Sequence, residues 1–143
     1  MKRVLVAGDF GKLHSGHLLH ISKAYALGDW LYIVTHRDHE IIERKHYTPD
    51  CLEDRLFMLE VFLRGLGGMG EIIMAIDRDG TVADTIKFLS PNVFAKGGRY
   101  TLDTLPVSEV EACREIGCEI VLGVGETLNE SRKIARERLH EEI

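Results

Sequence analysis

The order of short apolar runs and amphipathic segments constrains the fold of this chain more than any other sequence feature. Runs rich in β-branched and other apolar residues predict strands over 3–8, 30–36, 71–76, 92–96 and 118–123. Segments with helical periodicity predict helices over 16–28, 52–65, 80–89, 106–116 and 128–140. This alternation favours a parallel sheet with helices on both faces. We therefore expect one α/β, Rossmann-like domain over residues 1–143, with a five-stranded parallel sheet.

The segment between the first strand and the first helix carries most of the functional information. It reads Gly-Asp-Phe-Gly-Lys-Leu-His-Ser-Gly-His from Gly8 to His17. A helix N-terminus presents unpaired backbone N–H groups that favour anions, and the imidazoles of His14 and His17 add donors there. Gly16 would let the backbone approach a phosphate. The alternative is that one histidine caps the helix while the other binds a metal or lies on the surface.

The chain resembles the cytidylyltransferase-like nucleotidyltransferases, whose signature GxFDxxHxGH follows the first strand. The matching residues are Gly8, Phe10, His14, Gly16 and His17. Two positions need comment: Gly11 stands where the family usually has Asp, and Asp9 fills the variable second position. Asp9 either opposes the charge of a triphosphate, replaces the missing family Asp, or helps to hold a metal ion.

A basic stretch before the expected second long helix extends the resemblance. Lys45 lies in this stretch, and Arg55 follows in a segment similar to the family's "ExR" element. The resemblance implies that both contact phosphates, since a guanidinium fork neutralises two oxygens at once. The alternative is a solvated basic face that pairs with nearby glutamates.

The block from Pro91 to Tyr100 resembles the "PDLLVKGGDY" element of adenylyltransferases that activate heptose phosphates. Lys96 and Gly97 stand at the end of the fourth expected strand, which places a cation beside the first loop. Arg99 replaces the usual Asp. The alternative is that Gly97 and Gly98 form only a flexible turn.

The family's last element, a "GxSTT"-like turn, is weakly matched. Thr127 and Ser131 stand in its place and are candidates to reach the triphosphate. Thr127 also forms a possible capping box with Glu130, three residues further on, and this structural role is the alternative.

The reaction implied by the resemblance is nucleotidyl transfer from CTP or ATP to a small phosphorylated acceptor, with release of pyrophosphate. The implied roles are stabilisation of the α-phosphate by His14 and His17, and contact of Lys45, Arg55 and Lys96 with the remaining phosphates. Mg²⁺ is expected to bridge phosphate oxygens with few protein ligands. The resemblance also implies a homodimer. Candidate acceptors include sugar, polyol, amino-alcohol, flavin and pantetheine phosphates, and the Lys-Gly-Gly block favours a sugar or polyol phosphate.

Composition narrows the classes of partner. A net charge of −5 argues against a protein that coats nucleic acid. The sequence contains neither a long apolar run nor a signal-peptide pattern at Met1, so we expect no membrane association and a cytoplasmic location. Its three cysteines show no CxxC spacing and suggest no zinc site.

Two other classes of function are alternatives to catalysis. Gly11, Arg99 and the weakly matched last element are compatible with a regulatory or scaffold module that binds a nucleotide without reacting. Four cationic positions in one predicted crevice favour catalysis instead. A coenzyme-binding oxidoreductase domain is disfavoured, because the first loop lacks GxGxxG spacing.

Overall fold

A five-stranded parallel sheet with strand order β3-β2-β1-β4-β5 forms the centre of the computed structural model, which describes residues 1–125, 133 and 135–139. The strands are β1 (Arg3–Ala7), β2 (Trp30–Thr35), β3 (Gly70–Met74), β4 (Val93–Ala95) and β5 (Glu119–Val121). The strand order reverses at β1, whose neighbours are β2 on one side and β4 on the other. The carboxyl end of β1 is therefore a topological switch point, where ligands of such sheets bind.

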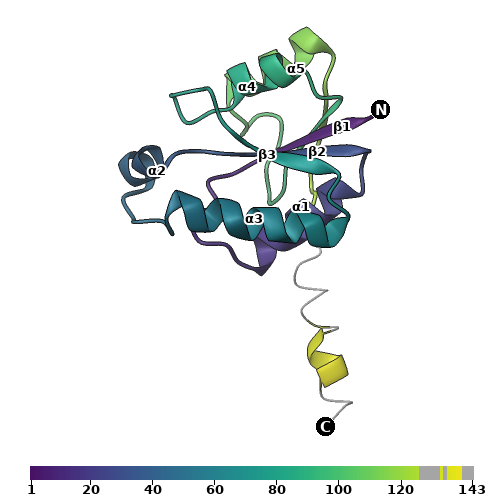
Figure 1. Ribbon diagram of the computed structural model, residues 1–143. Coiled ribbons are helices and arrows are strands. Elements are labelled where there is room, and N and C mark those ends of the chain that lie inside the picture. Colours follow the sequence, from purple (N-terminus) through teal and green to yellow (C-terminus); the bar gives the residue numbers. More distant parts are fainter. Residues whose placement is uncertain (126–132, 134, 140–143) are drawn as a thin grey trace.

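Helices cover both faces of the sheet (Figure 1). Those on one face are α1 (Ser15–Tyr25) and α3 (Leu52–Leu66), and those on the other are α4 (Ala83–Leu89) and α5 (Val107–Ile116). Alternate residues of a strand point to opposite faces, so Val4 and Val6 join the core under α1 and α3 while Leu5 joins the core under α4 and α5. The expected fold class is confirmed.

One short helix, α2 (Asp38–Lys45), was missed by the sequence analysis, which interpreted its end as a basic stretch alone. It has only eight residues and its sole buried apolar residue is Ile41, so its periodicity is weak. Its charges are the better signal, because acidic residues occupy its first turn and Arg44 and Lys45 its last, which complements the helix dipole. This helix brings Arg44 and Lys45 to the carboxyl edge of the sheet.

Other boundaries differ from expectation by a few residues. Helix α4 begins at Ala83 and not near 80, because the Asp77 carboxylate accepts hydrogen bonds from the backbone N–H groups of Asp84 and Thr85 and fixes the first turn there. Within the expected last helix, residues 133 and 135–139 are helical, and the rest lies outside the described residues. No helix in the described part of the chain combines the length and apolar character needed to cross a membrane.

Candidate active site at the switch point

A cavity of about 640 Å³ opens at the carboxyl end of β1. It is lined by these residues predicted from the sequence: Gly8, Asp9, Phe10, His14, Gly16, His17, Lys45, Lys96 and Gly97. Val124 and Gly125, from the loop after β5, also line it. The volume lies within the range of roughly 300–1,000 Å³ typical of ligand pockets.

Both predicted histidines cap α1 and line the cavity at once. Nδ1 of His14 accepts the backbone N–H of Gly16 at 3.0 Å, and Nδ1 of His17 accepts that of His14 at 3.3 Å. A ring nitrogen that accepts carries no proton, so the neutral rings hold theirs on Nε2. Capping and ligand binding are therefore not exclusive, since each ring keeps an Nε2–H donor. The backbone N–H of Gly16 is already hydrogen-bonded to Nδ1 of His14.

The neutral form of His17 is favoured by its surroundings. Burial is the main cause that lowers the pKa of His17, to about 4, and the nearby His14, His20 and Lys45 act in the same direction. Its ring stacks on His14 with centroids 3.8 Å apart and meets the edge of Phe10 at 5.3 Å. At neutral pH, His17 thus offers a hydrogen-bond donor in a fixed place and not a positive charge.

Phe10 supports this arrangement from below. It is buried and has a positive φ of 49°, which is uncommon for a bulky residue. Its ring lies so close to Gly8 that a Cβ on Gly8 would be 3.0 Å from Phe10 Cζ. Gly8 is therefore needed for the Phe10 ring to pack beneath His17.

His20, one turn after His17, is a site residue that the sequence analysis missed. Its Nδ1 donates to the backbone carbonyl of Val124 at 2.7 Å, because a carbonyl oxygen only accepts. Burial and the nearby Lys96 lower the pKa of His20. A Cβ on Gly97 would lie 3.0 Å from this ring nitrogen, so Gly97 permits the close approach of three segments and is not simply a flexible turn. The spacing of three histidines, each one turn apart, was the available signal.

Lys96 enters the cavity from the end of β4. Its Nζ lies 4.4 Å from the centre of the Tyr100 ring and 5.7 Å from that of Phe94, so the cation is held against aromatic faces. Burial lowers the pKa of Lys96. An incoming phosphate would replace the solvation that this ammonium group has lost.

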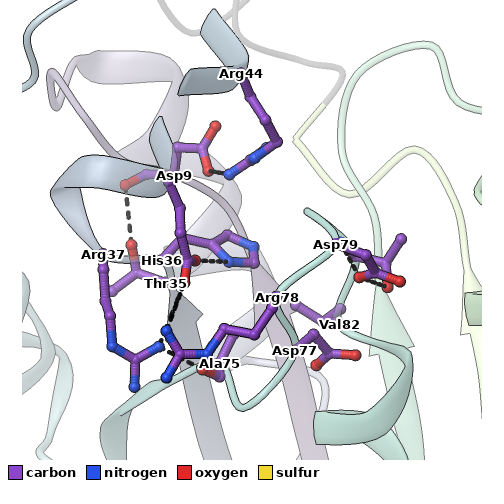
Figure 2. A network of polar contacts seen from close by, with 12 residues as sticks. Asp9, Thr35, His36, Arg37, Arg44, Ala75, Asp77, Arg78, Asp79 and Val82 are labelled. Carbon is purple, nitrogen blue, oxygen red and sulfur yellow. Dashed lines mark hydrogen bonds and ion pairs between the residues drawn. The ribbon is translucent and has the colours of Figure 1, made fainter. Parts of the chain in front are cut away.

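Asp9 is buried and paired with both cations at the end of α2. One carboxylate oxygen lies 2.8 Å from Arg44 Nη2 (Figure 2). The other lies 2.8 Å from Lys45 Nζ. Burial alone would raise the pKa of Asp9, but hydrogen bonds and charges from Lys45 and Arg44 outweigh it and hold the pKa below its ordinary value. Asp9 thus positions Lys45 at the cavity.

The structure contradicts the expected position of Arg55. This residue is fully buried and lines neither cavity at the carboxyl edge. Its guanidinium donates to Asp38, to the hydroxyl of Thr35 and to the carbonyls of Asp9, His36 and Asp50. These bonds use its donors to hold the first loop against β2 and α2. In this structure the Arg55 side chain therefore stabilises the first loop and does not reach either cavity.

The departure at Gly11 has a steric explanation. A Cβ on Gly11 would overlap the hydroxyl of Tyr47, a residue that also lines the cavity. The Gly11 carbonyl accepts the backbone N–H of Asp50 at 2.7 Å, which fixes the loop under that ring. An Asp at position 11 would require Tyr47 to move.

The remaining predicted residues, Thr127 and Ser131, lie outside the described residues. Over the described ranges, no cluster of His, Cys, Asp or Glu side chains has the arrangement needed to hold a metal ion. Asp9, the one carboxylate suggested for that role, has both oxygens in ion pairs. The described residues therefore do not form a metal site of the protein's own.

Comparisons with known proteins agree with this geometry. No protein-family model matches the chain. The FAD synthase of Methanosarcina acetivorans is 30% identical over 122 residues, which cover 85% of this chain and 76% of the relative. The bifunctional protein HldE of a Marinomonas species is 33% identical over 108 residues, covering 73% of this chain, and the match spans only 21% of that longer protein.

Solved structures with the same fold are more distant in sequence. A lipopolysaccharide core biosynthesis protein from Thermoplasma volcanium has a TM-score of 0.63 at 22% identity, covering 86% of this chain and 94% of that one. A protein of unknown function from Archaeoglobus fulgidus has a TM-score of 0.64 at 20% identity. Both support the fold alone. From its sequence relatives, the chain belongs to the cytidylyltransferase-like nucleotidyltransferase family of enzymes.

Proposed function

We propose that this protein transfers AMP from ATP to the phosphate of a small acceptor. A phosphate oxygen of the acceptor forms a bond to the α-phosphorus of ATP, the bond from that phosphorus to the bridging oxygen breaks, and pyrophosphate leaves. No covalent intermediate with the protein is required. The observation that carries this proposal is the pair of Nε2–H donors from His14 and His17 in one cavity with Lys45 and Lys96.

The roles of the four side chains follow from their charge and position. His14 and His17 donate to the oxygens of the α-phosphate, whose charge rises in the transition state. Lys45 and Lys96 neutralise the neighbouring phosphates and bring the two anionic substrates together. Gly8 and Gly97 allow close approach of the backbone, and Thr127 and Ser131 are proposed to contact the triphosphate.

ATP is preferred over CTP because several relatives are named FAD synthase, and FAD contains an AMP unit joined to FMN through its phosphate. The Lys-Gly-Gly block favours a sugar or polyol phosphate as acceptor. The same relatives make FMN the second candidate. Because the described residues do not form a metal site, Mg²⁺ is proposed to enter with ATP, bound to its phosphates. A homodimer and a cytoplasmic location complete the proposal.

The test is transfer of label from α-³²P-labelled ATP, and separately from labelled CTP, to a panel of phosphorylated acceptors. The panel contains glycerol 3-phosphate, hexose 1-phosphates, phosphocholine and FMN. We expect acceptor-dependent label in a new product with ATP. Nucleotide binding without transfer to any acceptor would support the regulatory module instead.

A further inference from the structure

A second, smaller cavity adjoins the first at the carboxyl edge of the sheet. Its volume is about 230 Å³, and it shares Gly8, Lys45 and Lys96 with the larger one. On its far side it is lined by Gly80, Val82 and Glu109, which come from the loop before α4 and from α5. The two cavities therefore meet at the cations that the proposed reaction requires.

Glu109 is the unusual feature of this second cavity. It is only 5% exposed, and its Oε2 accepts the backbone N–H of Val82 at 3.0 Å. The described part of the chain places no cation within ion-pair distance of it. Burial raises the pKa of Glu109, although the Val82 N–H and the charge of Lys96 act in the opposite direction. A buried carboxyl group costs free energy, so its presence in a cavity wall points to a ligand that uses it.

The position of Glu109 relative to the lysines defines an orientation for a ligand. A phosphate at the shared border would lie beside Lys45 and Lys96, and the group attached to it could then extend toward Glu109. A carboxylate oxygen only accepts, so its natural partners are hydroxyl or amine hydrogens. Because an ammonium group would lie close to Lys96, hydroxyl groups are the better match.

The size of the cavity disfavours FMN, one of the candidate acceptors. A volume of about 230 Å³ is below the roughly 300–1,000 Å³ of sites for drug-sized ligands. Apart from Tyr100, which also borders the larger cavity, and His36, its lining has no ring on which a flat tricyclic flavin would stack. A compact, polar group is the better fit.

We propose that the second cavity binds the non-phosphate part of the acceptor, that this part is a small hydroxyl-rich group, and that Glu109 selects it by accepting hydrogen bonds from its hydroxyls. This assignment rests on the proposed function for the placement of the acceptor phosphate. It gives Glu109 a role in acceptor choice that no sequence motif indicated.

The test measures acceptor binding separately from catalysis. Glycerol 3-phosphate, glucose 1-phosphate and FMN are titrated calorimetrically into the full chain saturated with α,β-methylene-ATP, which does not release pyrophosphate. The variants are Glu109→Gln, whose amide oxygen still accepts from Val82, and Glu111→Gln, a matched change at an exposed position of the same helix. Transfer of labelled AMP is measured on the same samples.

We expect at least one hydroxylated ester to bind at least tenfold more tightly than FMN. Glu109→Gln should weaken the binding of that ester at least tenfold without changing nucleotide affinity. Glu111→Gln should bind both ligands like the unaltered chain. The assignment would be overturned if FMN bound more tightly than the esters, or if Glu109→Gln bound the ester as tightly as the unaltered chain. It would also be overturned if neither ester bound. Ester binding that depends on Glu109 but is never followed by AMP transfer would contradict only the proposed reaction.

Discussion

His14 and His17 use the same ring nitrogen in the same way, and this decides what each can offer a ligand. Because Nδ1 of both rings accepts a backbone N–H, the proton of each neutral ring lies on Nε2. His20 is the opposite case, since its Nδ1 donates to Val124 and leaves Nε2 as an acceptor. His20 therefore differs in chemistry from the two preceding histidines, although each lies one turn from the next, and the sequence alone does not reveal this.

Substitutions at His17 distinguish the roles of its two ring nitrogens. The amide nitrogen of Gln reaches the position of Nε2, whereas that of Asn overlays Nδ1. If Nε2–H stabilises the α-phosphate, His17→Gln should keep more of the turnover number than His17→Asn, by about tenfold or more. Steady-state kinetics with saturating ATP gives this comparison. Equal loss in the two variants would contradict a role of Nε2–H in the reaction.

The depressed pKa of His17 predicts a pH-dependent contribution to stability. In the folded protein the pKa is about 4, whereas the unfolded value is near 6.5. Between these values the unfolded chain binds the proton and the folded chain does not, so the free energy of unfolding rises with pH. Urea unfolding from pH 4 to 6.5 should show a shallower rise in His17→Gln. An unchanged slope would show that the pKa of His17 is ordinary.

At the scale of the elements, Arg55 ties the first loop to β2 and α2. Arg55→Ala should lower the free energy of unfolding by about 3–5 kcal/mol, because it leaves buried carbonyl groups and Asp38 without their partner. Urea denaturation measures this effect. Arg64→Ala, an exposed change on the same helix, is the control, since its ion pair with Glu60 lies at the surface.

A role for Arg55 as a phosphate contact would give the reverse pattern. The Ala variant would then keep its stability and lose affinity for ATP. Thermal unfolding with and without ATP distinguishes the two outcomes, because a bound nucleotide stabilises only a fold that still binds it.

Some elements were predictable from the sequence and others were not, for identifiable reasons. The strands around β1 form continuous apolar runs such as Leu31 to Val34, which burial on both faces requires. Helix α2 has no comparable apolar pattern, because Ile41 is its one buried apolar residue. The buried state of Arg55 and the pairing of Asp9 with Lys45 depend on contacts between distant segments, which local pattern does not encode.

At the scale of the whole molecule, the two cavities meet where the strand order reverses. The larger cavity is lined by the loops after β1, β4 and β5, by the start of α1 and by Lys45 at the end of α2. The smaller cavity adds residues of α2, α5 and the loop before α4. In the proposed function, the larger cavity holds the nucleotide and the smaller one the acceptor, with Lys45 and Lys96 lining both. The homodimer expected from the family resemblance stays a prediction, and sedimentation equilibrium would test it directly.

Release of pyrophosphate by the unaltered chain and by His17→Ala is the most direct measurement of the central claim. With Mg²⁺, ATP and the preferred acceptor, we expect release that requires both substrates and falls by a factor of about 100 or more in the variant. Circular dichroism on the same samples should show an unchanged fold. Release that persists in a folded His17→Ala variant would contradict the assigned role of the histidine pair.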